Sequence, residues 1–176
     1  MSLNDRVRYG ALHARIMPAE QAAALIPAGA NVGMSGFTGA GYPKALPQAI
    51  AAHAQSEHSA GRPYKINVWT GASTAAECDG VLAGAHALGQ RLPFNTDPIA
   101  RKAINVGEID FIDMHLSHVA QHAWFGFLGH MDVAVIEVLG VTADGLLIPS
   151  TAVGNNKTWL EIADKVILEV NTKQSA

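Results

Sequence analysis

Apolar positions along the chain follow the two-residue period of strands in some segments and helical spacing in others. Apolar runs or alternation indicate strands at residues 30–35, 65–70, 109–114, 133–139 and 166–170. Helical spacing or a starting proline predicts helices at 18–26, around 46–53, and at 81–88, 98–105, 117–128 and 158–163. Residues 141–148 indicate a turn and a return strand around Asp144-Gly145. Strands that alternate with helices predict an α/β fold, with a mostly parallel sheet and helices on both faces.

Length and charge narrow the class of protein. The 176 residues suit one domain or half of a two-part enzyme, and 12 Lys and Arg against 15 Asp and Glu give a net charge of −3. This balance does not favour nucleic-acid binding, and no apolar run approaches the roughly 18 residues that cross a membrane. Charged residues make up only 15% of the chain, against about 25% in an ordinary domain. We therefore expect a surface that another domain or subunit covers, and a homo-oligomer.

The single cysteine, Cys78, bears on compartment and on chemistry. One cysteine cannot form an internal disulfide, and the first residues form no apolar run of signal-peptide type, so the sequence predicts a cytoplasmic protein. Cys78 stands between Glu77 and Asp79 and has no cationic neighbour in the sequence. A reactive thiolate is therefore not expected there.

A glycine-rich segment is the strongest candidate for a ligand site. Gly33, Gly36, Gly39 and Gly41 fall within nine residues, between a predicted strand and a predicted helix. Such a loop lets the backbone approach a ligand and directs N–H groups at an anion or a developing oxyanion. Its order matches neither the phosphate-binding loop nor the dinucleotide fingerprint. A tight turn without a ligand is the alternative interpretation.

The residues of this segment, Gly36-Phe37-Thr38-Gly39-Ala40-Gly41-Tyr42-Pro43-Lys44, resemble the acetyl-CoA hydrolase/transferase family, a branch of the class I CoA-transferases. Further stretches match in the same order and cover nearly the whole chain: residues 70–74, 101–105, 114–121, 144–149, 153–156 with Trp159, and 169–172. The resemblance implies a CoA-transferase-like (NagB/RpiA-like) N-terminal domain. It is far more specific than any one of these motifs.

The resemblance also implies a reaction, the exchange of CoA between an acyl-CoA and a carboxylate such as acetate or succinate, or hydrolysis of acetyl-CoA. In that family a glutamate attacks the thioester and passes through acyl-anhydride and glutamyl-CoA intermediates. Family members are about three times longer, and the glutamate lies in their second half. We therefore expect residues 1–176 to be a single N-terminal domain that carries no catalytic residue, the C-terminal catalytic half being absent or a separate subunit. CoA is expected as a substrate, with no cofactor.

The substrate-binding candidates are Gly36, Phe37, Thr38, Gly39, Ala40, Gly41, Asn155 and Asn156. The glycine-rich residues would form one wall of the active-site cleft. The two asparagines precede a predicted helix, where an asparagine that caps the helix is the alternative. A domain that binds an acyl-CoA or a carboxylate without catalysis, as a partner or regulatory subunit, is the alternative function.

Other reactive side chains favour structural interpretations. Glu137 is the one acidic residue in the apolar segment 133–139, where pairing with a neighbour is expected over nucleophilic use. Solvated positions are expected for the charged residues near element ends or on the surface: Glu77, Glu108, Glu169, Arg91, Arg101 and Lys102. For the three cationic residues, a role in holding an anionic substrate or the phosphates of CoA is the alternative. His115, His118 and His122 share one helical face, but the zincin glutamate is missing, so a capping or interface role is preferred over a metal site.

Overall fold

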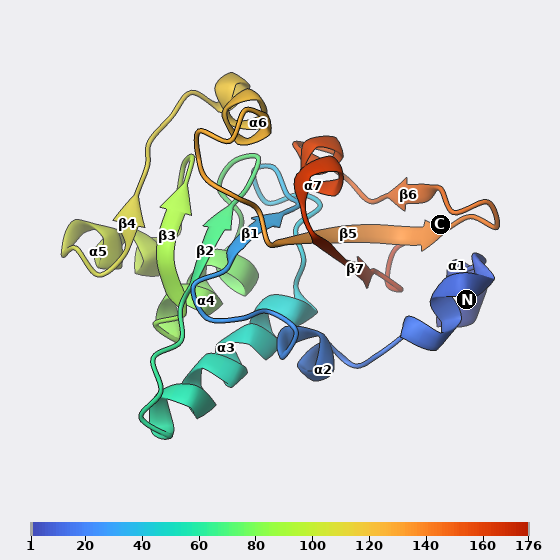
Figure 1. Ribbon diagram of the computed structural model, residues 1–176, viewed down its shortest axis with the longest axis horizontal. Coiled ribbons are helices and arrows are strands. Elements are labelled where there is room, and N and C mark those ends of the chain that lie inside the picture. The colour runs from blue at the N-terminus through green and yellow to red at the C-terminus, as the bar shows by residue number, and fades with distance from the viewer. Residues whose placement is uncertain (1, 176) are drawn as a thin grey trace.

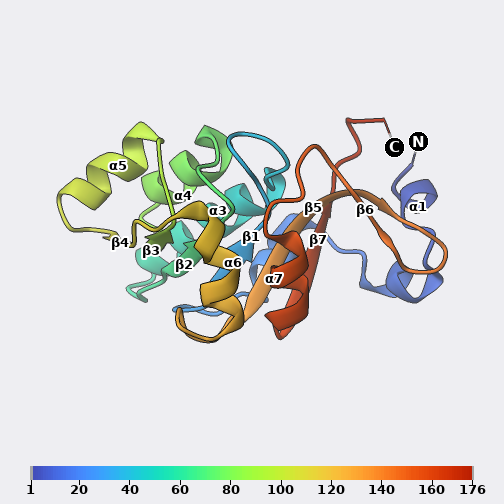
Figure 2. The ribbon, with the colours of Figure 1, turned by 90° about the horizontal axis from the view of Figure 1, so that it is seen from above.

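The computed structural model describes residues 2–175 as a seven-stranded sheet with helices on both faces (Figures 1 and 2). The path of the sheet is β4-β3-β2-β1-β5-β6, and β7 also pairs with β5. All neighbouring strands are parallel except β5 and β6, which form an antiparallel hairpin. The predicted α/β class, the mostly parallel sheet and the return strand are confirmed. The strands are β1 (Asn31–Met34), β2 (Ile66–Trp69), β3 (Leu88–Leu92), β4 (Asp110–Phe111), β5 (Val133–Val141), β6 (Leu147–Pro149) and β7 (Lys165–Val170).

Helices of unequal length connect these strands. They are α1 (Leu3–Arg6), α2 (Ala19–Ala23), α3 (Ala45–Ser59), α4 (Val81–Gly84), α5 (Pro98–Asn105), α6 (Leu116–Trp124) and α7 (Asn156–Ile162), with a 3₁₀ turn η1 (Gly10–Arg15) and a π-helical turn η2 (Ala76–Gly80). The prediction for α5 is confirmed at both ends, since the helix spans Pro98–Asn105. Asp97 caps its start by accepting hydrogen bonds from the N–H groups of Ile99 and Ala100. Within residues 2–175, no helix is long and apolar enough to cross a membrane.

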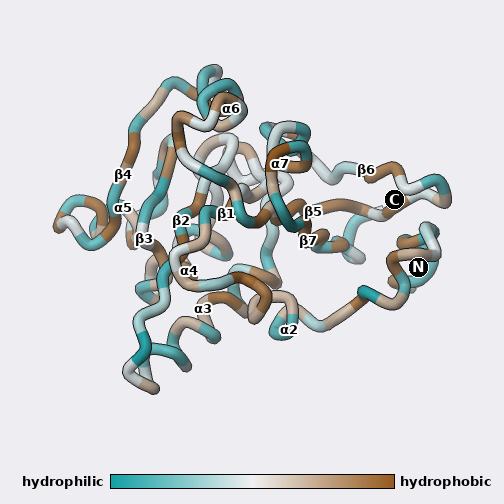
Figure 3. Tube along the Cα trace, viewed as in Figure 1, coloured by the Kyte–Doolittle hydropathy of each residue, from teal (hydrophilic) through white to brown (hydrophobic). Residues whose placement is uncertain are grey.

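Two hydrophobic cores lie on opposite faces of the sheet. Helices α2, α3 and α4 pack on one face and α6 and α7 on the other (Figure 1). Along β5, Val133 and Val135 belong to the first core, whereas Ala134 and Ile136 belong to the second. The strand is buried on both faces and therefore hydrophobic along most of its length, as its colour in Figure 3 shows.

The predicted helix at residues 81–88 is wrong in its second half. Helix α4 ends at Gly84, and Leu88 is already the first residue of strand β3. The sequence of β3 contains a glycine, a glutamine and an arginine, so it lacks the apolar run of a buried strand. The local pattern does not indicate a strand here. Residues 88–92 form one because they pair with β2 on one side and with β4 on the other.

The two ends of the chain lie side by side next to the β5–β6 hairpin (Figures 1 and 2). Arg6 is 5% exposed and donates hydrogen bonds to the carbonyl oxygens of Leu139 and Thr172, at 3.1 and 3.3 Å. A backbone bridge joins Val7 to Val141. A buried cation that binds carbonyl groups of β5 and of the segment after β7 therefore ties the first helix to the end of the sheet.

Candidate functional site

The loop that follows β1 is held in a closed turn by its own backbone. Phe37 and Ala40 exchange N–H···O hydrogen bonds of 2.9 and 3.0 Å. Gly36, Gly39 and Gly41 have φ values of 128°, 78° and 64°, which favour glycine, and Thr38 also has a positive φ of 50°. Within residues 2–175, the N–H groups of Thr38 and Gly39 have no hydrogen-bond acceptor. The turn therefore presents two free backbone donors at its tip.

Three loops meet at the carboxyl end of β1. A Cβ on Gly71, in the loop after β2, would lie 2.8 Å from the carbonyl oxygen of Gly36 and 3.7 Å from the Cα of Gly154. A Cβ on Gly41 would lie 2.9 Å from the backbone nitrogen of Ala152. Contacts this short between backbones require glycine. Because β1 and β2 are parallel neighbours, their following loops emerge at the same edge of the sheet, the usual place for ligands in this architecture.

The structure brings the segment 153–156 against the glycine-rich loop, so the two groups of substrate-binding candidates are neighbours. Helix α7 is fixed there by the indole N–H of Trp159, which donates to the carbonyl oxygen of Met34 at 3.2 Å. The capping interpretation of Asn155 is wrong: it occupies the position before α7, but its side chain makes no capping hydrogen bond. The side-chain nitrogen of Asn155 and the side-chain oxygen of Asn156 are instead buried without a partner among the described residues.

A groove of about 320 Å³ lies beside α7, and Asn156 is one of its lining residues. The rest of its wall is mostly aliphatic and comes from β5, β6 and α7: Ile136, Val138, Leu147, Pro149, Val153, Leu160, Lys157 and Glu161. Asn156 is 5% exposed. A buried amide oxygen with no protein partner carries a desolvation cost of about 1–3 kcal/mol, which a ligand or a covering domain would relieve.

Glu137 pairs with a neighbour, as the structural interpretation expected. Its carboxylate is fully buried and lies 2.5 Å from the ammonium of Lys44, which also donates to the carbonyl oxygen of Tyr42 at 2.8 Å. The side chain of Asn171 donates to the second carboxylate oxygen at 3.3 Å. Glu137 therefore anchors the end of the glycine-rich segment to β5, and its oxygens are occupied.

Glu169 is partly buried and its carboxylate is engaged by backbone donors, which corrects the expectation of a solvated position. It lies on β7, and its carboxylate accepts hydrogen bonds from three consecutive N–H groups at the start of α3: Lys44 at 2.7 Å, Ala45 at 3.1 Å and Leu46 at 2.8 Å. A carboxylate at the amino end of a helix satisfies free donors and complements the helix dipole. The sequence does not reveal this cap, because β7 and α3 are separated by more than a hundred residues.

Glu77 and Glu108 are exposed, as expected. Glu77 accepts a hydrogen bond of 3.2 Å from the Tyr42 hydroxyl. Partial burial, together with the nearby Glu77 carboxylate, raises the pKa of Tyr42. Neither glutamate is buried in an apolar environment of the kind that activates a carboxyl group.

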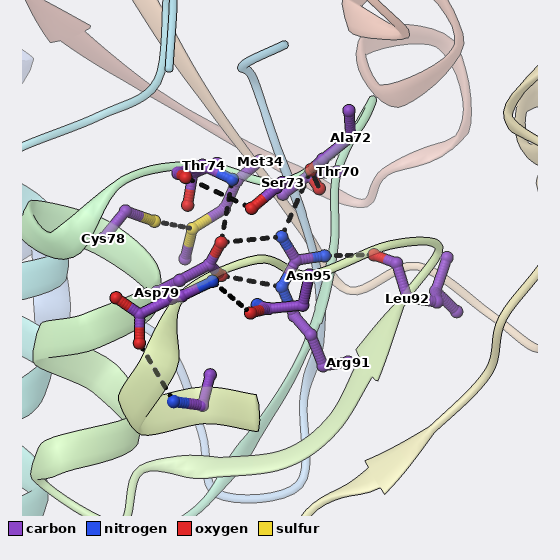
Figure 4. Close-up of polar contacts among 12 residues, drawn as sticks. Met34, Thr70, Ala72, Ser73, Thr74, Cys78, Asp79, Arg91, Leu92 and Asn95 are labelled. Atoms are coloured by element: carbon purple, nitrogen blue, oxygen red, sulfur yellow. Dashed lines mark hydrogen bonds and ion pairs between the residues drawn. The ribbon is translucent and has the colours of Figure 1, made fainter. Parts of the chain in front are cut away.

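Arg91 corrects a second expectation, because its side chain is fully buried rather than solvated. Figure 4 shows its contacts with Asp79 and the neighbouring residues. Its guanidinium forms a two-pronged ion pair with Asp79, with distances of 2.7 Å from Nε to Oδ1 and 3.1 Å from Nη2 to Oδ2. Burial by itself raises the pKa of Asp79. The positive charge of Arg91 and the hydrogen bonds from Arg91 and Thr74 have the larger opposite effect, so the pKa of Asp79 lies below its usual value. Arg101 and Lys102 are exposed, as expected.

Cys78 and the histidines remain outside any reactive cluster. Burial, and secondly the negative charge of Asp79, raises the pKa of the Cys78 thiol to about 12, so the thiol is protonated at neutral pH. His115, His118 and His122 lie in a row, with ring centroids 5.3 and 6.1 Å apart. His115 precedes α6 without capping it. Among residues 2–175, no group of three or more His, Cys, Asp and Glu side chains is placed to hold a metal ion.

Comparison with known proteins gives matches that span the chain. Residues 1–175 match the family described as the acetyl-CoA hydrolase/transferase N-terminal domain. The propanoyl-CoA:succinate CoA transferase of Escherichia coli is 48% identical over 155 residues, which are 88% of this chain and 32% of that protein. The succinyl-CoA:acetate CoA-transferase of Clostridium kluyveri is 40% identical over 169 residues, 96% of this chain and 31% of that protein. The chain therefore spans about a third of the length of these relatives.

Solved structures resemble the fold at lower identity. Glutaconate coenzyme A-transferase from Acidaminococcus fermentans has a TM-score of 0.65 at 13% identity, covering 87% of this chain and 68% of that chain. RipA from Yersinia pestis has a TM-score of 0.67 at 17% identity, covering 96% of this chain and 37% of that chain. At such identities the likeness concerns the fold alone.

Proposed function

This chain belongs to the acetyl-CoA hydrolase/transferase family, of which it is an N-terminal domain, and we propose that it serves an enzyme that transfers CoA between an acyl-CoA and a small carboxylate or hydrolyses the acyl-CoA. CoA is a substrate of this enzyme, and no cofactor is needed. The compartment proposed is the cytoplasm, since the single cysteine Cys78 is a buried free thiol.

The loop at residues 36–41 supplies one wall of the active-site cleft in this proposal. The observation that carries it is the meeting of three glycine-containing loops at the carboxyl edge of the sheet, with the free N–H groups of Thr38 and Gly39 at the tip. Backbone donors that are fixed before the reaction stabilise a developing oxyanion without reorganising. Asn155 and Asn156 face the substrate or the second half of the enzyme with their unpartnered amide groups.

The nucleophilic glutamate lies outside residues 1–176. Glu137 is buried and Glu169 partly buried beside the glycine-rich segment, and their oxygens are engaged by Lys44, Asn171 and the start of α3. A nucleophile needs a carboxylate that can reach the thioester carbon. The missing half, or a separate subunit, therefore provides it, and this chain alone is inactive.

An intact-mass experiment tests this division. The 176-residue chain and the full-length polypeptide that contains it are each incubated with acetyl-CoA or succinyl-CoA plus acetate. We expect CoA exchange and a glutamyl-CoA adduct in the full-length polypeptide only. An adduct on Glu137, or on another residue of this chain, would contradict the proposal. Binding of acyl-CoA without exchange by the full-length polypeptide would instead favour a partner or regulatory subunit.

Two matched glycine substitutions test whether the loop at residues 36–41 forms a wall of the active-site cleft. Gly39 and Gly61 have similar φ values, 78° and 73°, and neither has a heavy atom within 4 Å of a Cβ position. Replacement by valine therefore costs similar backbone strain at both sites. In the full-length polypeptide, Gly39→Val should reduce exchange strongly and Gly61→Val should not. Equal activity of the two variants would exclude the loop from the site.

Exposed aromatic side chains support the proposed contact with another domain or subunit. Trp124, Phe125 and Phe127, at the end of α6, are 52%, 61% and 73% exposed. Apolar residues that gather on a surface are typical of interaction sites. Sedimentation of the 176-residue chain should show self-association, consistent with a homo-oligomer, and a monomer at high concentration would count against it.

A further inference from the structure

The Asp79–Arg91 ion pair lies beneath the loop that follows β2, at residues 70–74 (Figure 4). Asp79 comes from the π-helical turn η2, and Arg91 comes from strand β3. Both side chains are fully buried. The chemistry proposed above uses neither of them.

The pair binds the loop through both of its charges. Arg91 Nη2 donates to the carbonyl oxygen of Ala72 at 3.2 Å, and Asp79 Oδ2 accepts from the N–H of Thr74 at 2.8 Å. Between these two contacts, the Ser73 hydroxyl bonds the hydroxyl of Thr96 at 2.8 Å and accepts from its N–H at 3.0 Å. One acceptor and one donor of the loop are thus held by opposite ends of a single rigid pair.

The held loop in turn limits the position of the glycine-rich loop. Gly71 immediately precedes Ala72 and lies so close to Gly36 that a Cβ would come within 2.8 Å of the Gly36 carbonyl oxygen. A shift of the 70–74 loop toward β1 would therefore push Gly36, and a shift away would remove its support. The contact is between backbones, which cannot rotate out of the way as a side chain can.

Stability alone is a weak reason for burying such a pair. Removing two charges from water is costly, and well-packed hydrophobic residues of similar volume often stabilise a fold equally well or better. A two-pronged arginine–carboxylate pair does, however, fix direction as well as distance. π-Helical turns such as η2 are also found frequently at functional sites.

We propose that Asp79 and Arg91 are positioning residues, which hold residues 70–74 and, through the Gly71–Gly36 contact, hold the 36–41 loop in the geometry that acyl transfer requires. This inference rests on the proposed function for its effect on catalysis, but not for its effect on the loop. Neither residue touches the substrate. Misplacement of a catalytic wall by about 1 Å can cost roughly a hundredfold in rate.

The test replaces the pair by hydrophobic residues, Asp79→Leu together with Arg91→Met. The control applies Glu57→Leu together with Arg62→Met to an ion pair at the surface, in which Glu57 of the last turn of α3 lies 2.6 Å from the exposed Arg62 just after that helix. Hydrogen exchange of residues 36–41 is measured in the 176-residue chain, and kcat and KM are measured in the full-length polypeptide. Circular dichroism and thermal unfolding establish that each variant is folded.

We expect the folded Asp79→Leu/Arg91→Met variant to show faster amide hydrogen exchange in the 36–41 loop, at the hydrogen-bonded N–H groups of Phe37 and Ala40. We also expect it to lose about tenfold to a hundredfold in kcat, with a much smaller change in KM. The control variant should match the wild type in amide hydrogen exchange at residues 36–41, in kcat and in KM. A folded variant with unchanged exchange and unchanged kcat would overturn the inference. If the double variant does not fold, Arg91→Lys serves in its place, because it keeps the charge and loses the fork that also reaches Ala72; wild-type kcat and exchange in Arg91→Lys would equally overturn it.

A wild-type polypeptide without CoA exchange would contradict the proposed function and not this inference. Amide hydrogen exchange at residues 36–41 then tests the positioning role by itself. Faster hydrogen exchange in the double variant than in the control would support the positioning role, and equal hydrogen exchange would overturn it.

Discussion

Replacing Gly71 by alanine adds one methyl group at the contact between two loops. The new Cβ would lie 2.8 Å from the Gly36 carbonyl oxygen, a distance at which one backbone must shift. Gly71 does not have a positive φ, so the substitution adds no left-handed strain and its cost is steric. Overpacking of this kind destabilises proteins by about 1–3 kcal/mol. For a chain of this length, about 3 °C in Tm per kcal/mol implies a fall of roughly 3–9 °C.

Thermal unfolding of the 176-residue chain measures this effect, with Gly84→Ala as the matched control. Gly84 is the last residue of α4, and nothing lies within 4 Å of its Cβ position, so alanine there should be neutral or stabilising by up to about 1 kcal/mol. The Gly71 penalty should also shrink in the Asp79→Leu/Arg91→Met variant, because a released loop can move away from Gly36. A Tm for Gly71→Ala at or above the wild-type value would refute the contact.

Three further outcomes concern side chains that the fold buries or engages. The Cys78 thiol, with its pKa raised to about 12, should resist iodoacetamide at pH 8 in the folded chain and react once the chain is unfolded in urea; a fast reaction in the folded state would place it in solvent. Folding lowers the pKa of Asp79, so its ionised carboxylate stabilises the fold above the unfolded pKa of about 3.9, and this contribution is lost as the pH falls. The difference in the free energy of unfolding between wild type and Asp79→Asn, measured in urea, should therefore shrink below about pH 4. Glu169→Ala should cost about 0.5–2 kcal/mol through loss of the α3 cap, whereas Glu161→Ala, which breaks only an exposed pair, should cost well under 1 kcal/mol in the same assay.

Much of the fold could be predicted from the sequence because the signals are local. The apolar segment of β5 and the proline-initiated helix α5 have patterns that their neighbours do not change. The glycine-rich segment 36–41 also stood out, since several positive φ values within a few residues require glycine in the sequence itself. The family resemblance rests on the same residues, and the matches along residues 1–175 confirm it.

The partners of two charged side chains, Arg91 and Glu169, could not be predicted, because they come from elements that are distant along the chain or joined only by the fold. Arg91 and Glu169 looked like solvated charges at element ends. The parallel pairing of β3 with β2 places Arg91 against Asp79, and the pairing of β7 with β5 places Glu169 at the start of α3. The positions at which glycine allows unusual backbone conformations are therefore readable from local sequence. The charges that fix this backbone in place follow from the fold alone, because the desolvation cost of an ion is offset only where strand pairing brings its partner beside it.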